Sequence, residues 1–264
     1  MAAEAAYLER GRESLRAIER VLPGDWSWSG KAVLDFGCGA GRVVRHLAEA
    51  SDCEAWGSDI SAACIDWDRR HLTPGASFVL HEEAPPLPLP DEKFDLIYAL
   101  SVFTHIADEW ATWLLELDRV LAPGGHVVCT LMSEGMCEAV TGEPWDEANF
   151  GMSVYEIGQS WELGGPMVIH SPWWIEEHWG RLFTIEHLQA RGFVEGAAAR
   201  GQDDHGVVVL RKSDGPRPSP RELEQPNPSA RRELTALDHT ARRLGREVAA
   251  LRNQAARRRW RFRG

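Results

Sequence analysis

Strand-like and helix-like segments alternate along the first half of this sequence, and that alternation constrains the fold more than any other feature. Short apolar runs with the character of buried strands occur at residues 32–38, 54–60, 77–81, 94–102 and 126–132. Segments with helical periodicity lie between them at residues 41–50, 64–72 and 107–121. Parallel strands joined by helices form a sheet whose two faces are both covered. The sequence therefore predicts an α/β fold with a Rossmann-like, doubly wound sheet.

The pattern changes after residue 132. Residues 133–175 contain glycines and tryptophans without a sustained period. A helical segment follows at residues 174–183, and we expect two further strands at residues 193–201 and 206–212, joined by a polar turn.

The N-terminal segment, residues 1–30, is predicted to be a capping helix. Leu8 and Ile18 lie on its apolar face, and Tyr7 and Arg10 are possible contacts of a cleft beneath it. Its mixture of acids and arginines differs from a signal peptide, and no apolar run has the roughly 18 residues that a membrane span needs. We expect a cytoplasmic protein.

Cysteine and histidine spacings argue against a disulfide framework and against a metal site. The five cysteines are odd in number and scattered, without CxxC spacing, and the histidines lack HxH or HExxH spacing. Reduced thiols and no bound metal are the expectation.

A composition change at residues 213–230 predicts a linker, because five prolines there argue against a helix or a central strand. Beyond it, residues 231–264 are predicted to form a heptad helix with a basic tail. The seam consists of Leu234, Leu237, Ala241, Leu244, Val248, Leu251 and Ala255. A coiled coil that joins copies of the chain through residues 231–255 is one interpretation, and a helix folded back on the body is the other.

The charge is unevenly distributed. The chain carries a net charge of −11, yet residues 211–264 hold 15 basic and 6 acidic residues, so this tail is +9 and residues 1–210 are −20. The acidic body should repel nucleic acid, whose phosphates dominate protein affinity.

A glycine-rich turn follows the first predicted strand. Gly37, Gly39 and Gly41 lie where the strand passes into a helix, and glycines there allow close approach of a ligand to the helix N-terminus. Asp59 follows Gly41 by 18 residues, at the end of the second predicted strand, where an acid can accept hydrogen bonds from both ribose hydroxyls. The combination predicts a nucleotide-like ligand.

The same turn argues against a dinucleotide. The dinucleotide fingerprint requires glycine at its sixth position, where this chain has Arg42. Asp35 precedes the turn, and its charge would oppose a pyrophosphate. A cationic or phosphate-free ligand fits better.

At this point the sequence resembles the class I S-adenosylmethionine-dependent methyltransferases, whose motifs it matches in order from residue 31 to about residue 132. VLDFGCGAGR resembles their first motif, GSDIS their ribose-binding acid, LPLPDEKFDLIYA their strand-four motif and LAPGGHVV the turn into strand five. The resemblance implies a methyltransferase domain over residues 31–212, with a seven-stranded sheet whose last strand is antiparallel. It also implies S-adenosylmethionine as cofactor, lying across the carboxyl ends of the first, second and fourth strands.

Carried over position by position, the resemblance names the cofactor-binding candidates. Asp35 and the backbone of Gly37, Gly39 and Gly41 would surround the methionine part, and Asp59 would hold the ribose. A helix cap is the alternative role for Asp35.

Three further candidates lie after other strands. Ile60 follows the ribose-binding acid, Glu83 matches an acid near the adenine amino group, and Ser101 would lie near the methyl group. Ile60 in the core and Glu83 as a solvated acid are the alternatives.

For the acceptor, a hydroxyl group needs a base, and the predicted catalytic residues are His105, His170 and Tyr155. His105 follows strand four, and its alternative role is to tie that loop to a backbone carbonyl. Residues 133–175 commonly form the substrate lid in the resembled superfamily. Its tryptophans Trp145, Trp161, Trp173 and Trp174 are substrate-stacking candidates or a satellite core.

The predicted function is methyl transfer to a small-molecule hydroxyl, of a sugar, glycoside or natural product. An N-methyltransferase is the first alternative, although ALSVF stands where amide- or base-methylating relatives carry an NPPY-like element. A non-catalytic cofactor-binding scaffold that recruits a partner through its C-terminal helix is the second.

Overall fold

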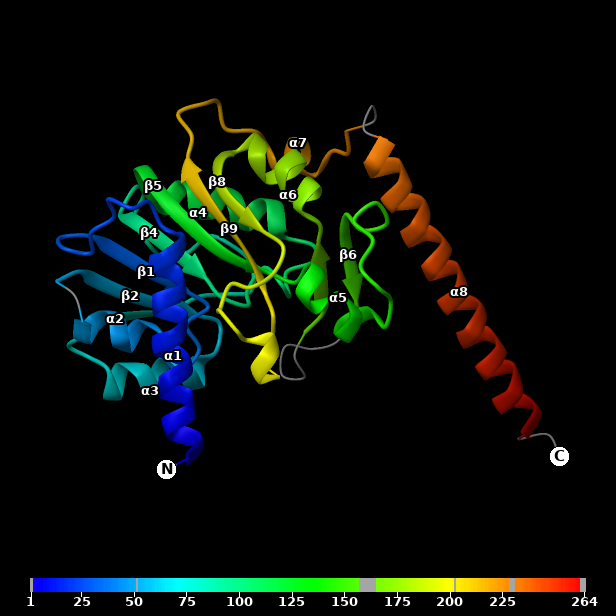
Figure 1. The fold of residues 1–264 in the computed structure, drawn as a ribbon, viewed down its shortest axis with the longest axis horizontal. Coiled ribbons are helices and arrows are strands. Elements are labelled where there is room, and N and C mark those ends of the chain that lie inside the picture. The colour runs from blue at the N-terminus through cyan, green and yellow to red at the C-terminus, as the bar shows by residue number, and fades with distance from the viewer. Residues whose placement is uncertain (1, 51, 157–164, 202, 228–230, 262–264) are drawn as a thin grey trace.

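The computed structural model describes residues 2–50, 52–156, 165–201, 203–227 and 231–261. A seven-stranded sheet lies at its centre, in the order β3-β2-β1-β4-β5-β9-β8 (Figure 1). The bounds of its strands are β1 Ala32–Phe36, β2 Glu54–Asp59, β3 Ser77–Leu80, β4 Phe94–Ala99, β5 Leu121–Leu131, β8 Phe183–Gln189 and β9 Gly206–Lys212. Only β9 runs antiparallel to its neighbours. The predicted α/β fold is confirmed, and so is the antiparallel last strand.

Helices cover both faces of the sheet (Figure 1). On one face pack α1 Ala2–Val21, α2 Val44–Ala50 and α3 Ala62–His71, and on the other pack α4 Trp110–Val120 and α6 Pro172–His178. Neighbouring strand residues alternate between the two cores: Val33 faces the first group of helices and Leu34 the second. The central strands are therefore buried on both faces, which explains their continuous apolar runs.

The prediction of a strand at residues 193–201 was wrong. The sixth strand of the chain to enter the main sheet is β8, and residues 193–201 instead form turns and the short 3₁₀ helix Ala198–Arg200. Gly192, Gly196 and Gly201 all have positive φ, and the segment is rich in alanine, which fits a pleated strand poorly. Residues 190–205 are thus the connection between β8 and β9.

The segment after β5 adds a small unit beside the main sheet. It contains α5 Glu134–Thr141 and a two-stranded antiparallel sheet of β6 Met152–Tyr155 and β7 Met167–His170. The 3₁₀ helix Trp179–Arg181 follows α6. Trp161 lies outside the described residues.

The proline-rich segment contains a helix, which differs from the predicted linker. Within it, α7 Pro220–Glu224 begins with proline at a position that needs no amide donor, and Ser219 and Glu222 form a capping box. Leu223 of α7 is fully buried in the main core. This part of the chain is therefore packed against the body.

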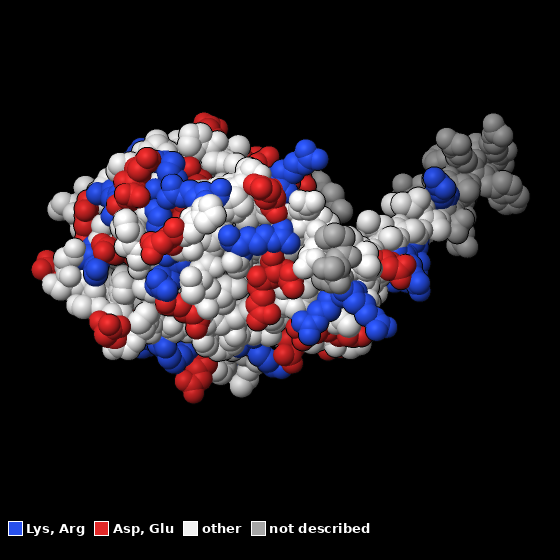
Figure 2. Space-filling view, turned by 90° about the horizontal axis from the view of Figure 1, so that it is seen from above, with Lys and Arg blue, Asp and Glu red and all other residues white. Residues whose placement is uncertain are grey.

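The C-terminal helix α8 Arg231–Arg261 projects beyond the body (Figures 1 and 2). Glu233, Ala236 and Arg243 face the body and are buried. The predicted seam residues Leu234, Leu237, Leu244, Val248 and Leu251 are 37–64% exposed. The apolar seam therefore points away from the body, and the side chain of Ala255 lies outside the described part.

Among the described residues, no helix combines the length and the apolar character needed to cross a bilayer. The space-filling view shows acidic and basic side chains interspersed over the visible face of the body (Figure 2).

Candidate functional site

The turn from β1 into α2 has the conformation that its glycines predict. Gly37 has a φ of +80°, and a Cβ there would lie 2.4 Å from a methyl carbon of Val102. The amides of Gly37 and Cys38 both donate to the carbonyl of Ser58 at the end of β2. The turn is thus fastened to β2 and leaves no room for a side chain at its first glycine.

Asp59, at the end of β2, holds this turn from the other side. One carboxylate oxygen accepts the amide of Ser61 at 2.8 Å, and the other accepts the amide of Gly39 at 2.8 Å. Each carboxylate oxygen can accept a second hydrogen bond. Asp59 can therefore order the turn and still bind two hydroxyl groups of a ligand.

A first cavity, the Asp59 cavity, has a volume of about 560 Å³ and lies at the carboxyl ends of β1, β2 and β4. Five of the predicted cofactor residues line it: Gly37, Asp59, Ile60, Glu83 and Ser101. Its apolar wall is made by Phe36, Val102, Ile106 and Trp113. The cavity thus combines an apolar wall with two acidic residues, Asp59 and Glu83.

His81 also lines the Asp59 cavity, and the sequence analysis missed it. Its Nδ1 lies 2.8 Å from the carbonyl oxygen of Glu82, which can only accept, so Nδ1 carries the proton and Nε2 is an acceptor. Nε2 is buried and has no hydrogen-bond partner among the described residues. Burial lowers the pKa of His81, which keeps the ring neutral at pH 7. His81 therefore lies in the cavity wall with an acceptor nitrogen that is buried and unsatisfied.

Asp35 and two of the glycines, Gly39 and Gly41, do not line the Asp59 cavity. Asp35 is buried and lines neither cavity described here, and burial raises its pKa to about 7 against the opposing influence of Tyr98, Arg42 and the Val44 amide. Its proximity to the first residue of α2 supports the helix-cap alternative. Gly39 and Gly41 shape the turn through their backbone.

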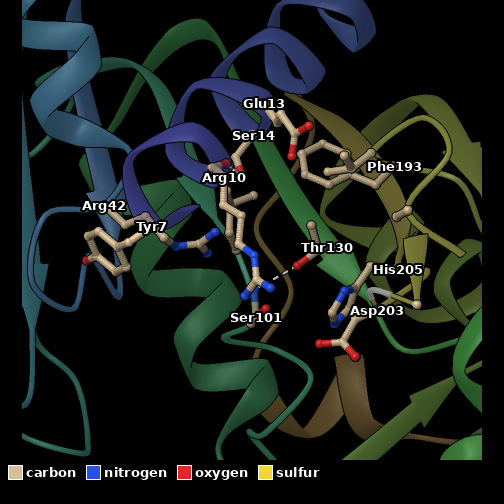
Figure 3. A pocket seen from close by; sticks show the side chains of 14 residues that line it. Tyr7, Arg10, Glu13, Ser14, Arg42, Ser101, Thr130, Phe193, Asp203 and His205 are labelled. Carbon is tan, nitrogen blue, oxygen red and sulfur yellow. Dashed lines mark hydrogen bonds between the residues drawn. The ribbon is translucent and has the colours of Figure 1, made fainter. Parts of the chain in front are cut away.

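A second cavity, the α1 cavity, has a volume of about 490 Å³ (Figure 3). Helix α1 contributes Tyr7, Arg10, Glu13 and Ser14 to its lining, and the turn after β1 contributes Arg42. Leu100 and Ser101 line it after β4, and Thr130 lines it from β5. The remaining lining residues precede β9: Phe193, Val194, Ala197, Gly201, Asp203 and His205. Tyr7 and Arg10 of the N-terminal helix thus line this cavity, whereas neither lines the Asp59 cavity.

Ser101 is the residue that the two cavities share. Its φ of +58° is rare for a residue with a side chain, and such strain clusters at functional sites. Its amide donates to the hydroxyl oxygen of Thr130 at 2.7 Å, which helps hold this conformation. The backbone at the junction between the two cavities is thus held in one conformation.

Charge in the α1 cavity is not fully paired. Glu13 lies 3.5 Å from Arg200, so that its charge is offset. The guanidinium groups of Arg10 and Arg42 form no ion pair within the part of the chain that the structure describes. The cavity can therefore accept anionic or strongly polar groups.

The predicted catalytic residues lie outside both cavities. His105 Nδ1 lies 2.9 Å from the Pro166 carbonyl oxygen, which supports its alternative role of tying the loop after β4. His170 is fully buried between Trp174 and Trp179, and burial lowers its pKa to about 3.

Tyr155 also lies away from the two cavities, on β6. The Arg243 guanidinium of α8 lies 4.2 Å from the centre of its ring. Burial raises the pKa of Tyr155 to about 12, which is unsuited to a base at neutral pH.

The tryptophans proposed for substrate stacking are packing residues in the structure. Trp173 and Trp174 are buried in the main core, and Trp145 stacks on Phe150 with ring centres 5.3 Å apart. They line neither cavity. Trp145 packs in a small separate cluster with Phe150, as the satellite-core alternative predicted, whereas Trp173 and Trp174 belong to the main core.

His205 is one of three titratable residues of the α1 cavity, with Glu13 and Asp203, that were not predicted from the sequence. The signal that could have found it is topological: β9 is antiparallel, so the residue before β9 lies at the same edge as the carboxyl ends of the parallel strands. In the sequence this position belongs to a polar turn.

Comparisons with known proteins agree with this geometry. Residues 34–129 match the family model described as a methyltransferase domain. The chain is 34% identical over 103 residues to 27-O-demethylrifamycin SV methyltransferase of Amycolatopsis mediterranei, covering 38% of each chain. It is 30% identical over 138 residues to a probable tocopherol O-methyltransferase of Oryza sativa, covering 48% of this chain and 38% of that one. The chain thus spans less than two fifths of the length of these relatives.

Solved structures share the fold. An S-adenosylmethionine-dependent methyltransferase from Mesorhizobium loti superposes with a TM-score of 0.59 at 21% identity, covering 76% of this chain and 98% of that one. The [4+2]-cyclase SpnF superposes with a TM-score of 0.54 at 20% identity, covering 78% and 82%. The second similarity shows that this fold serves more than one chemistry.

Proposed function

We propose that this chain is a class I S-adenosylmethionine-dependent methyltransferase, which the match of residues 34–129 to a methyltransferase domain supports, and that it transfers a methyl group from S-adenosylmethionine to a hydroxyl group of a small molecule. The observation that carries the proposal is the meeting of two cavities at Ser101. A methyl donor and an acceptor need separate spaces with one shared point, and the Asp59 cavity and the α1 cavity provide them.

The Asp59 cavity fits the adenosine part of the cofactor. Asp59 retains acceptor capacity for both ribose hydroxyls, and charge-assisted hydrogen bonds of this kind contribute about 1.5 to 3 kcal/mol. Phe36, Ile106 and Trp113 offer apolar faces to an adenine ring. The Nε2 acceptor of His81 and the nearby carboxyl of Glu83 are suited to its amino group.

The methionine part then lies toward the α1 cavity, along the backbone of the glycine turn. Arg42 lines that cavity beside the turn and is suited to the cofactor carboxylate. When bound, S-adenosylmethionine supplies an electrophilic methyl group on a sulfonium. Ser101 and Thr130 hold the junction at which that group meets the acceptor.

The remaining α1 cavity orients the acceptor. Side chains of helix α1 and of residues 193–201 and 203–205 line it, so that an acceptor bound between them can be held in line with the methyl group. Positioning of this kind supplies much of the rate in methyl transfer, because the reacting atoms meet in a fixed geometry. The volume of about 490 Å³ suits a small molecule and is too small for a polymer chain.

A sugar, glycoside or natural product is the acceptor class that we propose. Its hydroxyl-rich surface matches the polar lining of Arg10, Thr130 and Asp203. The names of the rifamycin and tocopherol relatives refer to O-methyl chemistry on small organic molecules. The net charge of −20 on residues 1–210 argues against a nucleic acid.

The test is transfer from methyl-labelled S-adenosylmethionine to a panel of glycosides and polyphenols, with the matching amines and carboxylic acids alongside. We expect label in a methyl ether, which resists mild alkali. Label found only in amines, or only in alkali-labile methyl esters, would contradict a hydroxyl acceptor. Binding of the cofactor without transfer to any compound would instead favour the scaffold alternative.

A further inference from the structure

His205 and Asp203 lie in the connection between β8 and β9, and both line the α1 cavity. Figure 3 shows them on the opposite side of the cavity from Tyr7 and Arg42, with Ser101 and Thr130 between. The imidazole and the carboxylate therefore face the space in which we have placed the acceptor. The following inference rests on the proposed function.

We infer that His205, with Asp203 beside it, accepts the proton of the acceptor hydroxyl during methyl transfer. In this step the acceptor oxygen forms a bond to the methyl carbon, and the carbon–sulfur bond breaks with its electron pair remaining on sulfur. The hydroxyl proton passes to a ring nitrogen of His205, and the carboxylate of Asp203 stabilises the resulting imidazolium.

The connection that carries His205 is held in place. The carbonyl of His205 accepts the amide of Phe193 at 2.9 Å. From α1, Arg20 donates to the carbonyl of Phe193 at 2.7 Å, and Glu13 pairs with Arg200 at 3.5 Å. The base is thus positioned relative to the helix that closes the cavity, as catalysis by a fixed group requires.

Several charges surround the ring. Burial lowers the pKa of His205, so it is neutral and able to accept a proton at pH 7. Asp203 and Asp204 oppose this shift, while His105 and Arg42 reinforce it. On α1, Arg10 and Glu13 line the same cavity.

The two acids differ in their availability. Asp204 is engaged, because it lies 3.0 Å from an Arg191 nitrogen and accepts the Gly192 amide at 2.7 Å. Asp203 is exposed and has no ion pair within the described part of the chain. Asp203 is therefore the carboxylate that is free to respond when the ring gains a proton.

The first test needs no acceptor. NMR titration of the His205 ring compares the complexes with S-adenosylmethionine, whose sulfur is cationic, and S-adenosylhomocysteine, whose sulfur is neutral. A positive charge near the ring disfavours its protonated form, so we expect the first complex to lower the His205 pKa by about 0.5 to 1 unit relative to the second. Equal pKa values in both complexes would overturn the placement.

The same titration tests the carboxylate. We expect Asp203→Asn to lower the pKa of His205 in the protein without cofactor, because a raising influence is removed. A pKa that does not move would overturn the pairing of the two residues.

The kinetic test compares His205→Gln with two other histidine-to-glutamine variants. We expect His205→Gln to lower kcat by about 10²- to 10⁴-fold, to abolish the rise of kcat with pH below 7, and to leave calorimetric affinity for S-adenosylhomocysteine unchanged. His71→Gln, an exposed change on α3, is the matched control. Full turnover in His205→Gln, or a loss confined to His105→Gln, would overturn the inference. A wild-type protein that methylates no hydroxyl would contradict the proposed function instead, and the first titration would still report on the placement of His205.

Discussion

Asp59 carries two roles at the scale of a single residue. Its two carboxylate oxygens each accept a backbone amide, from Gly39 and from Ser61, and the same oxygens face the cavity. A carboxylate in this position organises the turn, and we propose that it also binds the ribose of the cofactor. On this proposal, removing the carboxylate affects both the order of the turn and the hydrogen bonds to the ribose.

We expect Asp59→Ala to reduce the affinity for S-adenosylmethionine and for S-adenosylhomocysteine at least tenfold, which corresponds to about 1.4 kcal/mol. Isothermal titration calorimetry on both ligands measures the change. Asp66→Ala removes an exposed acid on α3 and is the control for loss of one negative charge. Wild-type affinity in Asp59→Ala would refute the assignment of this residue to the ribose.

The sequence predicted the residues that directly follow parallel strands better than those that reach the site from elsewhere. Gly37 follows β1, Asp59 ends β2 and Ser101 follows β4, and the carboxyl ends of those strands meet at one edge. His205 depends on the direction of β9 and on a loop whose course no local pattern specifies. His81 was not predicted, because the lack of a hydrogen-bond partner for its Nε2 atom depends on the folded structure and not on a local sequence pattern.

At the scale of elements, helices and strands with a strong local sequence pattern were predicted correctly, and those with a weak pattern were not. The helices and strands from residue 32 to 132 were predicted from short apolar runs and from helical periodicity between them. The expected strand at residues 193–201 was wrong, since β8 is an edge strand with a register shift between Ile185 and His187 and little local signal. Helix α7 was not predicted, because the prolines of residues 213–230 were taken to exclude a helix, although proline is compatible with the first turn of one.

Helix α8 presents two different faces. Glu233 lies 3.4 Å from His178, and Arg243 donates to the carbonyl of Val154 at 3.1 Å, so polar contacts fix the rotation of the helix on the body. That rotation leaves Leu237, which is 50% exposed, and Leu251, which is 64% exposed, directed outward. Heptad seams of this kind gain stability when a second helix covers them. We therefore propose that the seam pairs with the same helix of a second copy.

We expect the double variant Leu237→Glu and Leu244→Glu to lower the mass measured by light scattering to that of a single chain, because two charges on each seam repel each other. Ala249→Glu adds a charge at an exposed position off the seam and is the control. Substitution is preferable to truncation at residue 213, which would also remove Leu223 from the core. A mass that is the same for wild type and the double variant would show that the seam does not set the oligomeric state.

At the scale of the whole molecule, buried ionisable groups make stability depend on pH. Burial raises the pKa of Asp35 from 3.8 to about 7, so the folded state binds more protons than the unfolded state between these values, and this group lowers the free energy of unfolding as pH rises. Burial lowers the pKa of His170 from 6.5 to about 3, which has the opposite sign. Below pH 6.5 the unfolded chain gains the His170 proton first, so the free energy of unfolding falls as pH falls.

The substitution His170→Phe isolates the contribution of His170 to the pH dependence of the free energy of unfolding. The ring of His170 lies between Trp174 and Trp179, with centre distances of 5.5 Å and 5.8 Å, and neither ring nitrogen has a hydrogen-bond partner among the described residues. An apolar ring of similar shape should therefore be accepted at pH 7.

Each pH unit below 6.5 costs the wild type about 1.4 kcal/mol through His170, so we expect the wild type to lose about 2 kcal/mol relative to His170→Phe between pH 7 and pH 5. Urea unfolding at the two pH values measures the difference, and His71→Gln controls for loss of an exposed histidine. If wild type and His170→Phe lose stability in parallel, His170 has a partner in the folded state that accepts its charge, and its burial does not govern the response to acid.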